Sequence, residues 1–153
     1  GVFAACWGRV AGLDVAVGRD EAMGRLRGVN ERWVIEQAGA GAAGWRPEQV
    51  HGAGVAVVPG AETVGGCDGL PVVPGVDGLL TDQAGVVLSV VVADCGPLGL
   101  ADRARGAVGL LHSGRKGTEM GILGRGVELM GERFGTRPED LVVVLGPCIR
   151  PPH

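Results

Sequence analysis

The sequence predicts a single α+β domain, and three observations lead to this fold class. Short runs rich in valine and leucine alternate with glycine and proline turns, two stretches have helical periodicity, and predicted strands outnumber predicted helices. The chain has 153 residues, which is roughly the length of one domain and enough to bury one core. Because the strands follow in hairpin-like order without a linker, we expect mixed or antiparallel sheets with flanking helices over residues 1–153.

Two helices are predicted from apolar residues at three- and four-residue steps. The first covers residues 19–38, and Asp20 is its expected N-cap. The second runs from Thr118, a plausible N-cap, to Phe134. Its expected buried stripe comprises Met120, Leu123, Val127, Met130 and Phe134.

Strands are predicted from short apolar runs between turn residues, at 50–52, 55–58, 86–93, 107–111 and 141–145. The run 86–93 is almost entirely apolar and mostly valine, which is typical of a strand buried on both faces. Two glycine-rich segments are expected to lack strands: a joint at residues 38–44 and a loop at residues 59–76.

Composition excludes several classes of function. The net charge is −3, from 14 basic and 17 acidic residues, and no basic block favours nucleic acid or an anionic membrane as a partner. No apolar stretch approaches the ~18 residues of a transmembrane helix, and no export signal is visible. We therefore expect a cytoplasmic protein with reduced thiols, and we leave self-association open.

A candidate metal site follows from the spacing of Cys95 and His112. Ala93-Asp94-Cys95 ends the most hydrophobic predicted strand, and His112 ends the next one. A hairpin folded between residues 103 and 104 would place the two opposite each other, with Cβ atoms about 4.5–5.5 Å apart. Thiolate and imidazole suit zinc, and His51 could be a third ligand, leaving the open position of a catalytic zinc. The same pair could instead be a metal-free nucleophile and base, or an ordinary core cysteine and histidine.

Five strings then point to a known family: residues 49–52 (QVHG), 77–81 (DGLLT), 93–97 (ADCGP), 112–117 (HSGRKG) and 146–149 (GPCI). In this order they resemble the bacterial polyphenol oxidase or laccase-domain family, also described as purine nucleoside phosphorylases and as a peptidoglycan editing factor. The resemblance implies an α+β fold similar to that of a deamidating bacterial toxin. It also implies zinc held by His51, Cys95 and His112, with purine nucleoside and phosphate as small-molecule partners.

Further residues receive expected roles at this site. Asp94, beside Cys95, is a candidate for orienting a ligand or for acid–base catalysis. Gln49 and Asp77 are candidates for substrate contact, although Gln49 could be a polar residue at a strand edge and shaping of its turn is slightly favoured for Asp77. Arg115 and Lys116 stand where the family usually has Trp-Arg, so a positive charge for phosphate is retained. Four residues are expected to be spectators: Cys6, Cys67, Cys148 and His153.

The resemblance favours one function and leaves alternatives open. The first is a zinc-dependent purine nucleoside phosphorylase with adenosine deaminase activity. The second is a hydrolase with Cys95 as nucleophile and His112 as base, including editing of peptidoglycan precursors. The third is a degenerate, non-catalytic member, because the chain is expected to lack the family's C-terminal portion. Copper-dependent polyphenol oxidation ranks last, because a multicopper cluster needs more imidazoles than the three histidines present.

Overall fold

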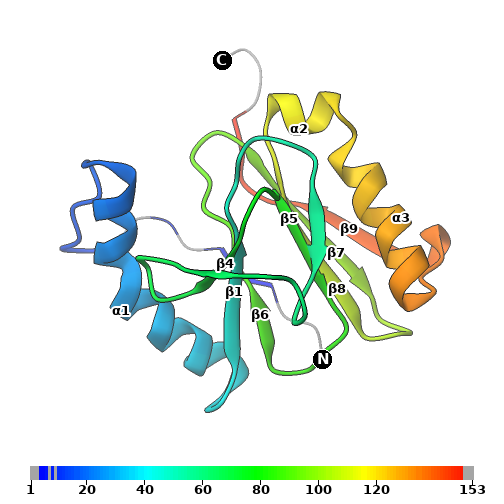
Figure 1. The fold of residues 1–153 in the computed structure, drawn as a ribbon, viewed down its shortest axis with the longest axis horizontal. Helices are drawn as coiled ribbons and strands as arrows, with labels where there is room; N and C mark the ends of the chain where they lie inside the picture. Colours follow the sequence, from blue (N-terminus) through cyan, green and yellow to red (C-terminus); the bar gives the residue numbers. More distant parts are fainter. Residues whose placement is uncertain (1–3, 7, 9, 150–153) are drawn as a thin grey trace.

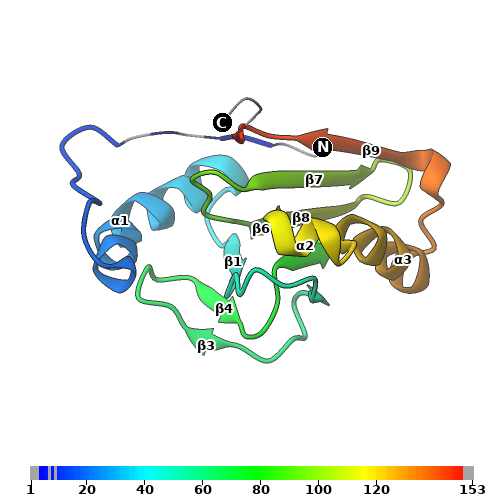
Figure 2. The same ribbon diagram turned by 90° about the horizontal axis from the view of Figure 1, so that it is seen from above.

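The computed structural model describes residues 4–6, 8 and 10–149, which form two β-sheets with helices packed against them (Figure 1). The four-stranded sheet has the order β3-β4-β1-β6, and the five-stranded sheet has the order β2-β5-β8-β7-β9. Seen from above, β3 and β4 lie on one side of the molecule, and β7 and β9 lie on the opposite side (Figure 2). The α+β fold with mixed sheets is confirmed.

The four-stranded sheet comprises β1 (Ala43–Pro47), β3 (Val64–Gly65), β4 (Pro71–Val73) and β6 (Val86–Leu88). Strand β1 pairs in parallel with β4 and β6, and β3 is antiparallel to β4. The predictions of a joint at 38–44 and a loop at 59–76 are therefore wrong, since these segments contain β3, β4 and the start of β1. Strands of two or three residues are too short to show an alternating pattern.

The predicted strand at 86–93 is also wrong in its length and burial. Only Val86–Leu88 pairs with a neighbour, and these residues are half-buried. Strand β6 lies at the edge of its sheet, and from Ser89 onward the chain leaves that sheet for the other one. The apolar run reflects a crossing between two sheets and not one long buried strand.

The five-stranded sheet comprises β2 (Val55–Val57), β5 (Gly78–Thr81), β7 (Gly96–Asp102), β8 (Ala107–Ser113) and β9 (Leu141–Leu145). Strand β2 is parallel to β5, and the other neighbours are antiparallel. The predicted strands at 55–58, 107–111 and 141–145 are thus present, whereas the one at 50–52 is wrong because His51 has a φ of 61°. Leu79, Leu80 and Leu111 have 0% exposure; Leu80 and Leu111 belong to one hydrophobic cluster and Leu79 to a second.

Helix α1 (Arg19–Ala38) covers the predicted residues and contacts β1 and β6, and its buried residues include Met23 and Val34. Its N-cap is Gly18, without a side-chain hydrogen bond, so the predicted cap at Asp20 is wrong. Asp20 lies in the first turn of α1, where its negative charge interacts favourably with the helix dipole and stabilises the helix. In the described part of the chain, no helix is long and apolar enough to cross a membrane.

The second predicted helix is two helices, α2 (Arg115–Glu119) and α3 (Ile122–Phe134), joined at Gly121. Gly121 has a φ of 75°, a left-handed conformation that ends one helix and redirects the next. Thr118 therefore lies inside α2, and its hydroxyl donates to the Gly114 carbonyl at 2.9 Å. Met130 is buried as predicted, and Val127 and Phe134 are half-buried. The predicted Met120 and Leu123 are exposed, and Ile122 and Gly126 are buried instead.

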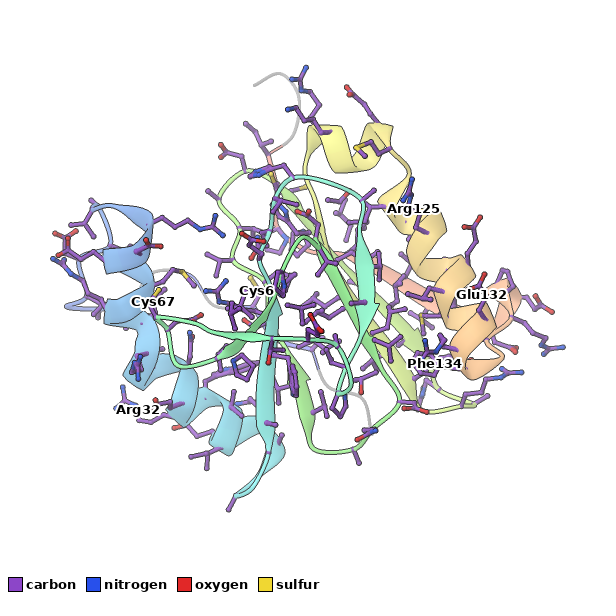
Figure 3. All side chains as sticks on the ribbon, viewed as in Figure 1. Cys6, Arg32, Cys67, Arg125, Glu132 and Phe134 are labelled. Atoms are coloured by element: carbon purple, nitrogen blue, oxygen red, sulfur yellow. The ribbon has the colours of Figure 1, made fainter. Side chains whose placement is uncertain are left out.

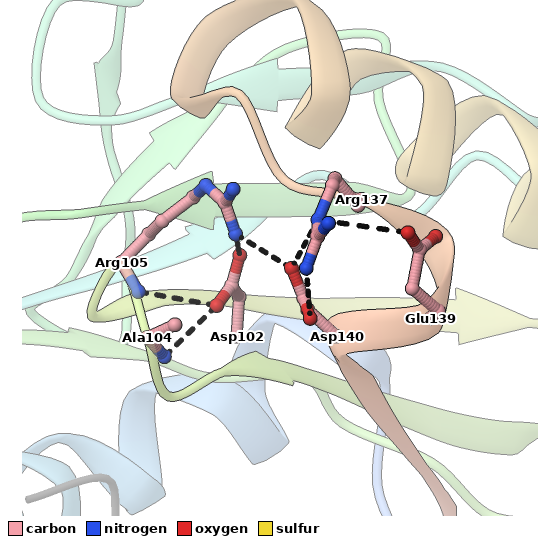
Figure 4. Close-up of polar contacts among 6 residues, drawn as sticks. All are labelled: Asp102, Ala104, Arg105, Arg137, Glu139 and Asp140. Carbon is pink, nitrogen blue, oxygen red and sulfur yellow. Dashed lines mark hydrogen bonds and ion pairs between the residues drawn. The ribbon is translucent and has the colours of Figure 1, made fainter.

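A charged network joins the β7–β8 turn to the 3-10 helix η1 (Pro138–Asp140), which leads into β9 (Figure 4). Arg105 donates to Asp102 at 3.1 Å and to Asp140 at 2.9 Å. Arg137 makes two further hydrogen bonds to Asp140, at 2.8 and 2.9 Å. The hydrogen bonds from Arg137 and then Arg105 lower the pKa of Asp140 to about 2.

Candidate metal centre

The centre lies where the chain crosses from the four-stranded sheet to the five-stranded sheet. Three connections make this crossing: residues 48–54 between β1 and β2, residues 74–77 between β4 and β5, and residues 89–95 between β6 and β7. They carry His51, Asp77 and Cys95, respectively. Residues that lie far apart in sequence therefore meet at one place, and His112 on β8 completes the group.

Main-chain hydrogen bonds hold the first two connections side by side. The Glu48 N–H donates to the Val73 carbonyl and the Gln49 N–H donates to the Val76 carbonyl, both at 3.0 Å. Gln49 and His51 have φ values of 64° and 61°, a left-handed conformation that is uncommon outside glycine. Such strain persists where surrounding contacts enforce it, and it is concentrated at functional sites.

Asp77 organises both histidines and is itself completely buried. Its Oδ1 accepts hydrogen bonds from the His51 main-chain N–H at 2.9 Å and from Nδ1 of His112 at 2.8 Å. Its Oδ2 accepts from the Gly52 N–H at 2.7 Å. Because Nδ1 of His112 donates to the carboxylate, Nε2 is the nitrogen left to face a ligand.

The ligand-type atoms converge on one point. One atom each from His51, Cys95 and His112 lies within 4.8 Å of the other two, and the two rings meet edge to face with centroids 4.9 Å apart. A tetrahedral zinc with bonds of about 2.0–2.3 Å needs ligand atoms about 3.3–3.8 Å apart. The upper limit of 4.8 Å on these distances includes the range that zinc needs, and one sulfur with two imidazole nitrogens is a suitable donor set. His112 is buried and His51 exposed, so the group is open to solvent on the His51 side.

Two glycines make room for this arrangement. A Cβ atom on Gly114 would lie 2.9 Å from Sγ of Cys95 and 3.3 Å from Cδ2 of His51. A Cβ on Gly117 would lie 2.6 Å from the carbonyl oxygen of Gly52. The space beside the thiol and the close packing of α2 on the His51 turn therefore both depend on the missing side chains. No local pattern in the sequence indicates these two roles, because they depend on contacts that form only in the folded chain.

The predicted hairpin register is wrong by two residues. His112 pairs with Pro97, and the strands turn between Asp102 and Ala107, one residue later than expected. Cys95 precedes β7 and lies beside Gly114 instead of opposite His112. Since successive side chains alternate between the two faces of a strand, a slip of two preserves the face, whereas a slip of one would reverse it. The predicted grouping of Cys95 and His112 therefore survives the error.

The other candidate residues occupy different surroundings. Arg115 and Lys116 are exposed at the start of α2, directly after Gly114. Asp94 is exposed, and its carbonyl accepts from the Ile149 N–H at 3.1 Å. The Gln49 side chain is 7% exposed, and both ends of its amide bond to the main chain of Val91.

Among the described residues, Cys95 is the one cysteine in the group with His51 and His112 that could hold a metal ion. Cys67 lies beside α1 (Figure 3), where its carbonyl accepts from Arg27. Cys6 is exposed and Cys148 is partly buried. His153 lies outside the residues that the structure describes.

The fold and this group define an α+β protein with a His–Cys–His centre built between two sheets. Residues 8–153 match the family described as multi-copper polyphenol oxidoreductase laccase, and the chain belongs to that family. This confirms the resemblance inferred from the five strings.

Several relatives of this chain are named purine nucleoside phosphorylases. YlmD from Geobacillus stearothermophilus is 45% identical over 105 residues, which cover 68% of this chain and 38% of the relative. ORF3 from Streptomyces griseus is 37% identical over 151 residues, covering 97% of this chain and 57% of the relative. The crystal structure of the Geobacillus YlmD superposes with a TM-score of 0.70 at 36% identity, covering 90% of this chain and 50% of that one. The chain thus spans about half the length of these relatives.

Proposed function

We propose that this chain is a zinc-dependent purine nucleoside phosphorylase that also deaminates adenosine, acting in the cytoplasm. Relatives that carry the first of these names support a nucleoside substrate. The observation that carries the proposal is the convergence of His51, Cys95 and His112 within 4.8 Å, with Asp77 fixing one imidazole. Three protein ligands are the number typical of a catalytic zinc, whereas structural zinc takes four.

The donor set suits a single zinc ion and cannot hold the several copper ions of the family's description. One thiolate and two imidazoles suit zinc, and the three histidines of the chain are too few for a cluster of several copper ions. Bound zinc would supply a Lewis acid with an open coordination position.

The residues next to the centre would handle phosphate and protons. In phosphorolysis, a phosphate oxygen forms a bond to the ribose C1′ while the glycosidic bond to the purine nitrogen breaks, and the purine takes up a proton. Arg115 and Lys116 follow His112 by three and four residues and would attract and orient the phosphate anion. We assign the Asp94 carboxyl group to proton transfer: in phosphorolysis it protonates the departing purine. In deamination the oxygen of a water molecule forms a bond to C6 of adenine, the bond from C6 to the amino nitrogen breaks, and Asp94 protonates the departing ammonia.

Gln49 and Asp77 take supporting roles in this proposal, in place of the substrate contacts expected from sequence. The polar atoms of both side chains are occupied by hydrogen bonds within the protein. Asp77 fixes the His112 ring and the main chain of the turn that carries His51.

The test combines metal analysis with a product assay on the purified chain. We expect one zinc per chain and phosphate-dependent release of adenine from adenosine, with inosine as the deamination product. Cys95→Ala should lose zinc and both activities together, whereas Cys67→Ala, the same change beside α1, should keep them. Undiminished activity in zinc-free protein would refute the proposal.

A second candidate is a hydrolase of the cysteine–histidine type, including one that edits peptidoglycan precursors. It is favoured by the Asp77–His112 hydrogen bond of 2.8 Å next to the Cys95 thiol, since a nucleophile, a base and a group that orients the base form such a triad. Alkylation of Cys95 would then abolish hydrolysis, and a chelator would leave it intact. Inactivation by the chelator excludes this candidate, and any turnover excludes a non-catalytic role.

A further inference from the structure

Within the part of the chain that the structure describes, few main-chain hydrogen bonds anchor the segment that carries Cys95. Residues 89–95 belong to no strand or helix. The Ser89 N–H donates to the Trp45 carbonyl at 2.9 Å where the segment begins, and the Asp94 carbonyl accepts from Ile149 near its end. Val91, midway, is 45% exposed, so its own side chain contributes little packing against the core, while Val90 and Val92 beside it are half-buried.

One side chain supplies the missing anchor. Nε2 of Gln49 donates to the Val91 carbonyl at 2.7 Å, and the Val91 N–H donates to Oε1 of Gln49 at 2.9 Å. The two residues are 42 positions apart, and Gln49 is 7% exposed. In the described part of the chain, this amide is the side chain that hydrogen-bonds the 89–95 segment to the turn carrying His51.

Only a primary amide of this length can make both bonds from this position. A glutamate would have no hydrogen to donate to the Val91 carbonyl, and a leucine of similar volume would make neither bond. The backbone of Gln49 is itself fixed, because its N–H donates to Val76 and its φ is 64°. The amide is therefore a rigid link between two ligand-bearing connections.

We propose that Gln49 is a positioning residue that sets the distance between Cys95 and His51 by clamping the main chain of Val91. This inference rests on the proposed metal site and assigns Gln49 no contact with substrate. A link that holds two ligand-bearing segments spares the metal the cost of ordering them, so its loss should weaken binding. The effect expected is about 10–100-fold in zinc affinity, as for other groups that support metal ligands.

The test compares Gln49→Leu with Gln37→Leu, which makes the same chemical change on the exposed surface of α1. Leucine and glutamine are both unbranched at Cβ, so the left-handed backbone strains them similarly. Zinc affinity is measured by competition with a chromophoric chelator, at a temperature where all proteins are folded. We expect weaker binding in Gln49→Leu and unchanged binding in Gln37→Leu. Equal affinities in both variants would overturn the inference.

Hydrogen exchange of the Val91 amide provides a second readout that needs no metal. In the metal-free wild-type chain this amide should exchange slowly, although it lies outside every strand, and Gln49→Leu should accelerate its exchange. Rapid exchange in the folded wild-type protein would overturn the clamp even if the variant fails to fold. A third outcome separates the two proposals. If the wild-type chain binds no zinc but its Val91 amide exchanges slowly, the proposed zinc-dependent function is refuted, and with it the role of Gln49 in zinc binding. The hydrogen-bonded link between Gln49 and Val91 is then still supported.

Discussion

Replacing Asp77 by asparagine tests how the centre is held together. The carboxylate accepts three hydrogen bonds: from the main chain of His51 and Gly52, and from Nδ1 of His112. Asparagine has one acceptor oxygen, and its NH2 group must face at least one of these donors. A buried donor left unsatisfied costs about 1–3 kcal/mol of folding free energy.

The same change should weaken metal binding more specifically. Removing the carboxylate frees His112 to rotate or change tautomer, and loss of such a partner typically lowers metal affinity about 10–100-fold, or about 1.4–2.8 kcal/mol. The assay is zinc competition against a chelator, with thermal unfolding measured on the same samples. Asp82→Asn is the matched control, because Asp82 is exposed just beyond β5. An Asp77→Asn protein with wild-type zinc affinity would refute the orienting role.

Three further predictions address other parts of the molecule. Gly114→Ala should reduce zinc affinity at least about tenfold, because the added Cβ enters the space of the Cys95 thiol. The control Gly124→Ala, whose Cβ would have nothing within 4 Å, should bind zinc normally and gain about 0.5–1 kcal/mol in free energy of unfolding. Unchanged zinc binding in Gly114→Ala would contradict the packing argument. Arg115→Ala combined with Lys116→Ala should raise KM for phosphate about tenfold or more and leave zinc content unchanged, so an unaltered phosphate KM would exclude them as phosphate contacts. The pKa of Asp140 in the folded state is about 2, below its ordinary value of 3.8, so its ionised form stabilises the fold above about pH 4 and this contribution is lost as the pH falls toward 2. The free energies of chemical unfolding of wild type and Asp140→Asn should therefore differ most above about pH 5 and converge near pH 2. A difference that is the same at every pH would refute this prediction.

The sequence predicts elements best where a single periodic pattern runs long enough. Helix α1 and strands β8 and β9 lie close to their expected residues, because each pattern is continuous. The run 86–93 misleads, because a crossing between two apolar sheets has the same composition as a buried strand. The break at Gly121 is also hidden, since one glycine inside a helical pattern is often tolerated.

The sequence brings Cys95 and His112 together although the strand pairing from which this was inferred is wrong. Cys95 and His112 come together despite the two-residue slip in register, because a slip of two residues leaves each side chain on the same face of the sheet. The roles of Asp77 and Gly114 depend on contacts between segments that are distant in the chain. No local pattern encodes such contacts, so these roles emerge only from the folded arrangement of the three connections.

Zinc stoichiometry in the purified chain tests the central claim most directly. Elemental analysis of protein prepared without chelators should find one zinc per chain in the wild type and in Cys67→Ala. His51→Ala, Cys95→Ala and His112→Ala should each lose most of it while remaining folded. Zinc retained in all three ligand variants, or a folded wild-type chain that takes up no zinc when it is supplied, would contradict the account.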